Sequence, residues 1–452
     1  NTISTNTVYG LVLEAYASTP NVASTGNTIT ENVISGNGRD GIYAGKDQNN
    51  NQYLENTITG TIGLEVSGDF EGNGIYLWKS SGNTVSGNLI ADHVEYGIEM
   101  MGSSGNSITG NTITGNQDGM VIRNINETLN PGYSIRNNQI EGNRIYGNTE
   151  VNLYADPNFE FSIARNWWGS AEESEIVAKL ASWVSDDDPD PWIVPGTTVN
   201  LVYAPWCANE ACSAFVYVVT PAQDITALLA EAPAGSVFLL SAGTYNVSGG
   251  INIRTPNLTF RLKPGAVIQN SSPCFIINAD NTRILAELGA KCIPTNGSNG
   301  IDVADGITGV TVDGLEIDGS GQETGDGIAF AGAVTDVVLV DNFIHDLDSD
   351  GISFAAEPAG LVDIHGNLFM NNTGFGINSN GATVPAEYNS WGSASGAAAP
   401  AGDGISAGVD AEPFTHVALS LVSSGAPWAN QVVKGSTISY AVKANLVNVN
   451  AA

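Results

Sequence analysis

Short runs in which apolar and polar residues alternate recur along most of this chain. Copies of an Asn-Thr-Ile-Thr-like tetrapeptide begin at Asn27, Asn56, Asn83, Asn106 and Asn111. Gly-Ile or Gly-Met pairs interleave with them and begin at Gly41, Gly74, Gly97 and Gly119. A period of two indicates β-strands with one buried face, and the Asn-Gly, Gly-Asn and Asp-Gly pairs between the runs indicate turns.

A second array of the same kind follows later in the chain. Its Gly-Ile pairs begin at Gly300, Gly327, Gly351 and Gly376, at steps of 27, 24 and 25 residues. Repeats of 22 to 29 residues, each with three short strands and no helix, predict the coils of a parallel β-helix. We expect the coils to stack about 4.8 Å apart, with Ile, Val and Leu inside and an Asn side-chain ladder at one turn position.

These N-x-I-x-G-N and D-G-I units resemble those of the right-handed parallel β-helix repeat proteins, which have pectate-lyase-like solenoids. The resemblance covers about residues 1–170 and 215–395. Residues 435–442 resemble the opening strands of a cohesin-like or immunoglobulin-like β-sandwich. The expected fold is therefore all-β, with two right-handed parallel β-helix solenoids in tandem, followed by strands of a β-sandwich module. The function stays open, because such solenoids occur in lyases, hydrolases, epimerases and non-catalytic surface proteins.

Each array ends at a tryptophan next to glycine, and these endings divide the chain. We expect Trp167, Trp168 and Trp391 to be structural caps over the last coils, with sugar stacking as the alternative. The expected domains are 1–170, a first solenoid that continues upstream, and 171–215, a capping helix, acidic loop and linker. They are followed by 216–415, a second solenoid with an N-terminal cap helix, and 416–452, the start of a sandwich or a strand-exchange tail.

Two capping boxes predict the short helices of this scheme. Residues 170–173 read Ser-Ala-Glu-Glu and precede a helix with Ile176, Val177, Leu180 and Trp183 on one face. Residues 220–223 read Thr-Pro-Ala-Gln and precede a helix through Leu228 and Leu229.

The four cysteines lie close together in two pairs, Cys207 with Cys212 and Cys274 with Cys292. No C-x-x-C motif or nearby His completes a zinc site. We expect two disulfides and an extracellular, secreted or cell-surface location, with free buried thiols as the alternative.

The charge of the chain excludes some partners. It has 15 basic and 47 acidic residues, a formal net charge of −32. No basic patch is present to attract nucleic acid, and no apolar stretch is long enough to span a membrane as a helix.

Asp326 and Asp350 are the first candidates for catalysis, because both precede Gly-Ile at equivalent repeat positions. On neighbouring coils their carboxylates would lie roughly 5 Å apart, as in retaining glycosidases. His345 and His365 lie nearby in the repeat register. We favour a turn role for the two Asp residues, since Asp-Gly is a common turn pair that also occurs in the first array.

The sequence of the second array agrees less well with a uronate lyase or epimerase than with a hydrolase. Between Lys291 and Lys434 the chain has no Lys or Arg, and such enzymes need cations beside the substrate carboxylate. The paired-Asp and Arg-x-Lys signatures of polygalacturonases are also absent.

No cofactor is required, and Ca²⁺ is the alternative we keep open. Its candidate oxygen ligands are Asp186, Asp187, Asp188, Asp190 and Asp326.

We therefore expect a non-catalytic extracellular or cell-surface β-helix protein with a structural or adhesive role. Its expected partners are further copies of itself or neighbouring surface proteins, and polysaccharide. Candidate glycan contacts are Tyr76, Trp78, Tyr96 and Phe375, with a role as rung fillers as the alternative. The competing hypothesis is a polysaccharide-active enzyme, a glycoside hydrolase before a lyase or epimerase.

Overall fold

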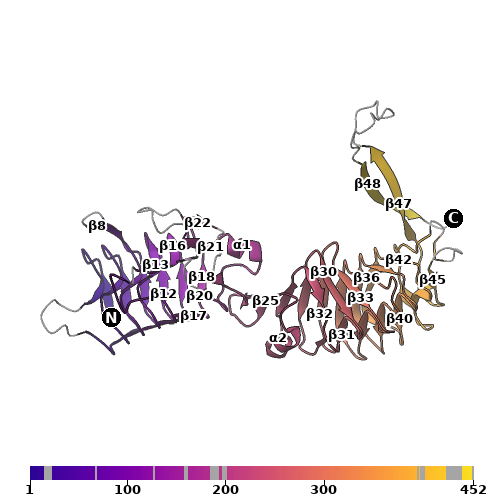
Figure 1. The fold of residues 1–452 in the computed structure, drawn as a ribbon, viewed down its shortest axis with the longest axis horizontal. Helices are drawn as coiled ribbons and strands as arrows, with labels where there is room; N and C mark the ends of the chain where they lie inside the picture. The colour runs from indigo at the N-terminus through magenta and orange to yellow at the C-terminus, as the bar shows by residue number, and fades with distance from the viewer. Residues whose placement is uncertain are drawn as a thin grey trace. The chain divides into compact units, whose positions relative to one another are not determined.

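The computed structural model describes residues 1–14, 23–66, 69–125, 128–156, 161–183, 193–195, 201–393, 396–397, 403–423 and 440–449. The chain divides into two compact units, Asn1–Val216 and Tyr217–Ala452. Each unit contains a stack of parallel coils, seen in Figure 1 as successive layers of short strands. The expected all-β fold of parallel solenoids is thereby confirmed.

Three sheets run along the first unit. One sheet contains, in spatial order, β1 (Thr2–Ser4), β4 (Val33–Ser35), β7 (Thr57–Thr59), β12 (Leu89–Ala91), β15 (Thr112–Thr114) and β18 (Arg144–Tyr146). The next contains β2 (Leu11–Leu13), β5 (Ile42–Ala44), β10 (Ile75–Trp78), β13 (Tyr96–Met101), β16 (Asp118–Arg123), β19 (Leu153–Ala155), β21 (Leu180–Trp183) and β22 (Ile193–Pro195). The last contains β17 (Gln139–Glu141), β14 (Ser107–Thr109), β11 (Thr84–Ser86), β6 (Gln52–Leu54) and β3 (Thr28–Thr30).

Smaller strand pairs accompany these sheets. The pair β8 (Leu64–Val66) and β9 (Asp69–Glu71) is antiparallel, whereas β20 (Phe161–Ser162) and β23 (Leu201–Val202) are parallel. The parallel pairing of β19 with β21 shows that coil structure continues beyond Trp168.

The second unit repeats the three-sheet plan. One sheet contains β26 (Val237–Leu240), β29 (Thr259–Leu262), β32 (Thr282–Ala286), β35 (Thr308–Asp313), β38 (Thr335–Val340) and β41 (Ala359–His365). The second contains β27 (Gly243–Tyr245), β30 (Ala266–Asn270), β33 (Lys291–Pro294), β36 (Glu316–Asp318), β39 (Phe343–His345) and β42 (Leu368–Met370). The third contains β28 (Ile251–Ile253), β31 (Phe275–Ile277), β34 (Ile301–Val303), β37 (Ile328–Phe330), β40 (Ile352–Phe354), β43 (Phe375–Asn378) and β45 (Gly404–Ile405). A short parallel pair, β44 (Val384–Pro385) with β46 (Val409–Asp410), completes the coil after β43.

The interior of each unit is built from in-register rungs. Ile42, Ile75 and Ile98 are neighbours across β5, β10 and β13, and all three are fully buried. In the second unit Phe330 stacks on Phe354 with ring centroids 4.5 Å apart. Such repeated burial supplies the hydrophobic stabilisation that a single coil could not provide.

Two corners in the described part of the first unit carry unbroken asparagine ladders, and a third corner carries bonds of the same kind from Asn6 to Asn37 and from His93 through Asn116 to Asn148. The first ladder comprises Asn27, Asn51, Asn83, Asn106 and Asn138. The second comprises Asn32, Asn56, Asn88, Asn111, Asn143 and Asn166. In both, each backbone N–H donates to the amide oxygen one coil further along. The expected ladder is therefore present at more than one corner, because the coils carry Asn at several of their bends.

Two short helices lie near the expected positions. Helix α2 (Ile225–Glu231) begins after Asp224, whose carboxylate accepts from the N–H groups of Thr226 and Ala227. Helix α1 (Glu173–Val177) is shorter than expected, since Leu180 and Trp183 belong to strand β21. Tertiary pairing with β19 thus prevails over helix propensity in that segment.

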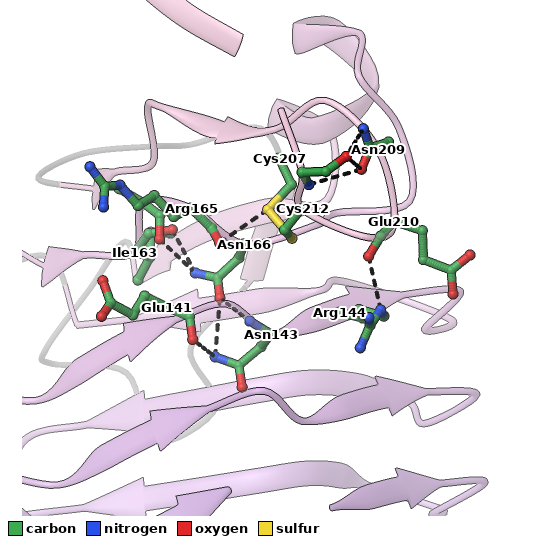
Figure 2. The surroundings of a disulfide bond; sticks show 12 residues. Glu141, Asn143, Arg144, Ile163, Arg165, Asn166, Cys207, Asn209, Glu210 and Cys212 are labelled. Carbon is green, nitrogen blue, oxygen red and sulfur yellow. Dashed lines mark hydrogen bonds between the residues drawn. A yellow bond between two sulfur atoms is a disulfide. The ribbon is translucent and has the colours of Figure 1, made fainter. Parts of the chain in front are cut away.

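Both expected disulfides are present, Cys207–Cys212 and Cys274–Cys292. Cys207 lies in β24 (Trp206–Cys207), which pairs antiparallel with β25 (Phe215–Val219). The Cys207 N–H donates to the carbonyl of Asn166 at 3.0 Å. Figure 2 shows the amides of Asn143 and Asn166 in successive coils beside this disulfide. The disulfide-bonded loop therefore lies at the end of the second ladder.

The C-terminal strands β47 (Phe414–Ser423) and β48 (Tyr440–Val449) form an antiparallel pair. This pair is all that the described residues show of the expected sandwich, which stays a prediction. No helix among the described residues is long and apolar enough to cross a membrane.

Candidate functional site

Partly exposed aromatic side chains form a stripe on the second sheet of the first unit. Because Ile42, Ala44, Ile75 and Leu77 point inward and are fully buried, the residues that alternate with them project outward. We call the stripe and its neighbouring side chains the aromatic face, which comprises Tyr43, Lys46, Tyr76, Trp78, Lys79 and Tyr133. The rings of Tyr43 and Tyr76 pack edge to face with centroids 5.7 Å apart.

Two lysines lie over the Trp78 and Tyr133 rings of the aromatic face. The Lys79 ammonium lies 4.7 Å from the centre of the Trp78 ring and 5.5 Å from that of Tyr133. Lys46 lies 5.7 Å from the centre of the Tyr133 ring, and the Tyr133 hydroxyl donates to Asp47 at 2.7 Å. The face therefore combines apolar ring surfaces with positive charge.

A buried polar group lies on the same sheet, on β13 and β16. The Glu99 side chain accepts from Asn73 Nδ2 at 3.0 Å and lies 3.5 Å from the Arg123 guanidinium. Arg123 also donates to the Tyr96 hydroxyl at 2.7 Å. Burial raises the pKa of Tyr96 to about 12, so its phenol stays protonated at neutral pH.

Asp118, at the start of β16, is fully buried. Its Oδ1 accepts from the Val151 N–H at 3.1 Å, whereas no hydrogen-bond partner for Oδ2 is found in the described structure. Burial raises the pKa of this carboxyl group from 3.8 to about 6, despite the Val151 bond.

Asp118→Asn is expected to stabilise the protein at pH 7.5 by about 1–2 kcal/mol and to have little effect at pH 4. Because the folded-state pKa is raised, the folded protein binds the extra proton between pH 3.8 and 6, and stability falls as the pH rises through that window. Urea unfolding at several pH values measures the effect. The exposed Glu31→Gln variant is the control, and an Asp118→Asn effect that is equal at both pH values would contradict the interpretation.

A second charged cluster lies on the outer face of the second unit. We call it the Lys291 cluster: Lys291, Glu316, Asp318, His345 and Asp346, from β33, β36 and β39 and the turn after β39. Cys292, Ile317 and Ile344 alternate with these residues and are fully buried, so the charged side chains project outward.

The contacts within the Lys291 cluster are short. The Lys291 ammonium lies 2.6 Å from Glu316 Oε1 and 3.1 Å from Asp318 Oδ2. His345 Nδ1 lies 2.7 Å from Asp346 Oδ2, and its Nε2 lies 3.3 Å from Glu316 Oε1. The hydrogen bond to Glu316 raises the pKa of Lys291, and the hydrogen bond to His345 lowers the pKa of Asp346.

Asp326 and Asp350, the first catalytic candidates, lie on neighbouring coils. Asp326 Oδ1 accepts from Ser349 Oγ at 2.5 Å and from the Asp350 N–H at 3.1 Å. Asp350 in turn accepts from the N–H of Phe375 and from Asn378. Each carboxylate thus ties its turn to the next coil, which is the geometry that a turn role requires; a catalytic or calcium-binding role stays a prediction.

The other candidates are spread over the chain. His365 is exposed and pairs only with Asp363 among the contacts found in the described structure, at 2.6 Å. Phe375 is 40% exposed, far in sequence from the aromatic face. Trp168 and Trp391 are buried, and Trp167 is half-buried. The acidic run Asp186, Asp187, Asp188 and Asp190 lies outside the described residues.

Tyr76, Trp78, Tyr96 and His345 were candidates from the sequence, whereas most of the residues that contact them were not. Asp318 and His345 are register partners 27 residues apart, the same step that separates Gly300 from Gly327. Alignment of the repeats on their Gly-Ile pairs would therefore have placed the two side chains together. No comparable signal places Tyr133 beside Lys46.

Comparisons with known proteins bear on the fold. A family described as right handed beta helix region matches residues 1–166. No curated protein matches the chain. Among solved structures, the PL6 family alginate lyase AlyGC is 12% identical with a TM-score of 0.22, over 86% of this chain and 74% of that one. A mutant of the same lyase is also 12% identical, with a TM-score of 0.18, over 85% of this chain and 74% of that one.

The family match and the observed parallel coils agree over the first unit. Residues 1–166 thus match the model of a right-handed β-helix family, and a second parallel β-solenoid follows them in the same chain.

Proposed function

We propose that this chain is an extracellular, non-catalytic β-helix protein that binds polysaccharide along the aromatic face of its first unit. The observation that carries this proposal is the clustering of Tyr43, Tyr76, Trp78 and Tyr133 with two lysines on one outward surface. Aromatic rings offer apolar faces to the C–H surfaces of sugar rings, and ammonium groups donate to hydroxyl or carboxylate oxygens.

The solenoid beneath the aromatic face favours binding by a prearranged surface. Tyr43 and Tyr76 are register partners on adjacent coils, and the rungs below them are fully buried. A surface whose side chains are already held in place loses little conformational entropy when a ligand binds. An extended glycan chain fits such a stripe because Tyr43 and Tyr76 present their rings on two successive coils along the same direction.

The pKa values and hydrogen bonds of the buried polar residues beside the aromatic face favour glycan binding over catalysis. A general base near neutral pH needs a pKa close to that pH. The Tyr96 phenol, with a pKa of about 12, is far from it, and Glu99 already accepts from Asn73 and pairs with Arg123. Asp118 has a pKa of about 6, but its side chain is fully buried and accepts from the Val151 N–H, so it is not exposed to a substrate. These groups resemble a fixed structural network more than a poised acid and base.

The two disulfides support an oxidising, extracellular location. In that setting a rigid solenoid that binds glycan would serve as a stalk, an adhesin or a component of a surface layer. Association with further copies or with neighbouring surface proteins belongs to this proposal.

A glycan array of neutral and acidic oligosaccharides tests the proposal, followed by calorimetric titration of the best ligand. Trp78→Ala is expected to weaken binding at least about tenfold, which corresponds to 1.4 kcal/mol. Tyr388→Ala removes an aromatic side chain that is 48% exposed on the second unit, and it is the matched control.

Two results would overturn the proposal. One is the absence of any ligand on the array; the other is equal affinity of Trp78→Ala and the wild type for the ligand found. The same glycans are incubated with the protein and assayed for new reducing ends and unsaturated products. Turnover would favour the competing hypothesis of a polysaccharide-active enzyme.

A further inference from the structure

We propose that Glu316, Asp318 and His345 of the second unit bind a divalent transition-metal ion, with Zn²⁺ as the best fit. One oxygen of each carboxylate and one imidazole nitrogen lie within 4.8 Å of one another. Zn–O and Zn–N bonds of about 2.0–2.2 Å place two ligand atoms at most about 4.4 Å apart. Small side-chain rotations therefore suffice to bring all three donors onto one ion.

The backbone holds these donors in position. Asp318 and His345 are register partners on the adjacent parallel strands β36 and β39, and Glu316 lies two residues before Asp318 on the same outward face. The His345 side chain is only 8% exposed, and its ring stacks on Phe343 with centroids 3.9 Å apart. Sites built on strands are better defined than sites on loops.

Asp346 orients the imidazole as it would for a metal ligand. Its Oδ2 lies 2.7 Å from His345 Nδ1, and Asp346 itself accepts from Ser320 Oγ and Asn371 Nδ2. A metal-binding His commonly donates its other ring N–H to a carboxylate, which fixes the tautomer. If Nδ1–H donates to Asp346, the neutral ring turns its Nε2 lone pair towards Glu316 Oε1, 3.3 Å away.

The net charge of the Lys291 cluster is negative enough to balance a dication. Glu316, Asp318 and Asp346 contribute −3 and Lys291 contributes +1, so −2 remains when His345 is neutral. Lys291 now pairs with Glu316 and Asp318, and it would have to give way to the ion. Its side chain is 32% exposed on a flexible stem, so the ammonium can turn to solvent.

The donor set favours zinc over calcium. Ca²⁺ takes six to eight oxygen ligands, whereas an imidazole with two carboxylates suits Zn²⁺ and leaves a coordination position for water. This site is distinct from the aromatic face, so glycan binding and metal binding are tested independently.

Calorimetric titration of the chelator-treated full chain with Zn²⁺ tests the proposal, with Ca²⁺ titrated in parallel. We expect one Zn²⁺ per chain, bound at least about tenfold more weakly by His345→Ala and about 10–100-fold more weakly by Asp346→Asn. Lys291→Met is expected to bind several-fold more tightly, because it removes the competing cation. His365→Ala, which removes the exposed His of the other His–Asp pair, is the matched control and should bind as the wild type does.

Circular dichroism shows whether each variant is folded. If loss of His345 or Asp346 disturbs folding, Zn²⁺ binding by Lys291→Met still tests the site. The proposal is overturned if neither the wild type nor Lys291→Met binds Zn²⁺, or if folded His345→Ala binds with unchanged affinity. Tighter binding of Ca²⁺ than of Zn²⁺ at the His345-dependent site would also overturn it.

Discussion

Replacement of Asn111 by Ala is expected to lower the free energy of unfolding of the first unit by about 3–5 kcal/mol. Asn111 is fully buried in the second asparagine ladder. Its Oδ1 accepts from the N–H and the Nδ2 of Asn88, at 3.0 and 2.9 Å. Its Nδ2 donates to the carbonyl of Val85 at 2.8 Å and to Asn143 Oδ1 at 2.9 Å. Removal of the amide leaves several buried groups unpaired, and each costs about 1–3 kcal/mol, with partial relief from water or rearrangement.

Urea unfolding followed by circular dichroism measures this loss. Gln139→Ala, in the next coil, is the control, because Gln139 is exposed and its side chain bonds only to Glu141 among the contacts found in the described structure. The control is expected to stay within about 0.5 kcal/mol of the wild type. If Asn111→Ala costs no more than Gln139→Ala, the ladder does not contribute to stability in the way that its hydrogen bonds indicate.

The coils themselves could be predicted because their signals are local and repeated. Asn at the bends and Gly-Ile before an inward rung recur in both units, so the period of two and the repeat length pointed to one architecture. The sequence could not separate the two ladders, however. The Asn27 and Asn56 tetrapeptides look alike, yet β3 and β7 belong to different sheets. Only the spatial stacking of coils, whose bends lie from 23 to 32 residues apart, distinguishes them.

The local sequence pattern predicts only part of the aromatic face. Tyr76 and Trp78 could be predicted to project outward, because they alternate with buried residues on β10. The cations beside them could not, because the contact of Lys46 with Tyr133 joins two turns almost ninety residues apart. The helix expected at Leu180 and Trp183 failed for a related reason: pairing with β19 is a contact between coils that helix propensity does not include.

Trp391 illustrates how a cap acts as part of the core. Its side chain is fully buried and stacks on Phe369 with ring centroids 5.0 Å apart. A Cβ atom added at Gly376 would lie 2.9 Å from the indole ring, so glycine is what allows the ring to pack against that backbone. Strand β45 still pairs with β43 beyond this point, which places Trp391 within the last coils rather than over an open end. Its burial also leaves no free ring face on which a sugar could stack.

Trp391→Ala is therefore expected to destabilise the second unit by about 3–5 kcal/mol, because it leaves a large cavity under Phe369. Trp391→Phe should cost much less, about 1–2 kcal/mol. It keeps a ring in the stack and removes an indole N–H that has no hydrogen-bond partner among the described residues. Tyr388→Ala, whose side chain is 48% exposed, is the control and should cost under 1 kcal/mol, on the order of a surface substitution. Urea unfolding of the three variants ranks them. If Trp391→Ala is no less stable than Tyr388→Ala, the indole is not a core element, and the last coils must be held by their strand pairing alone.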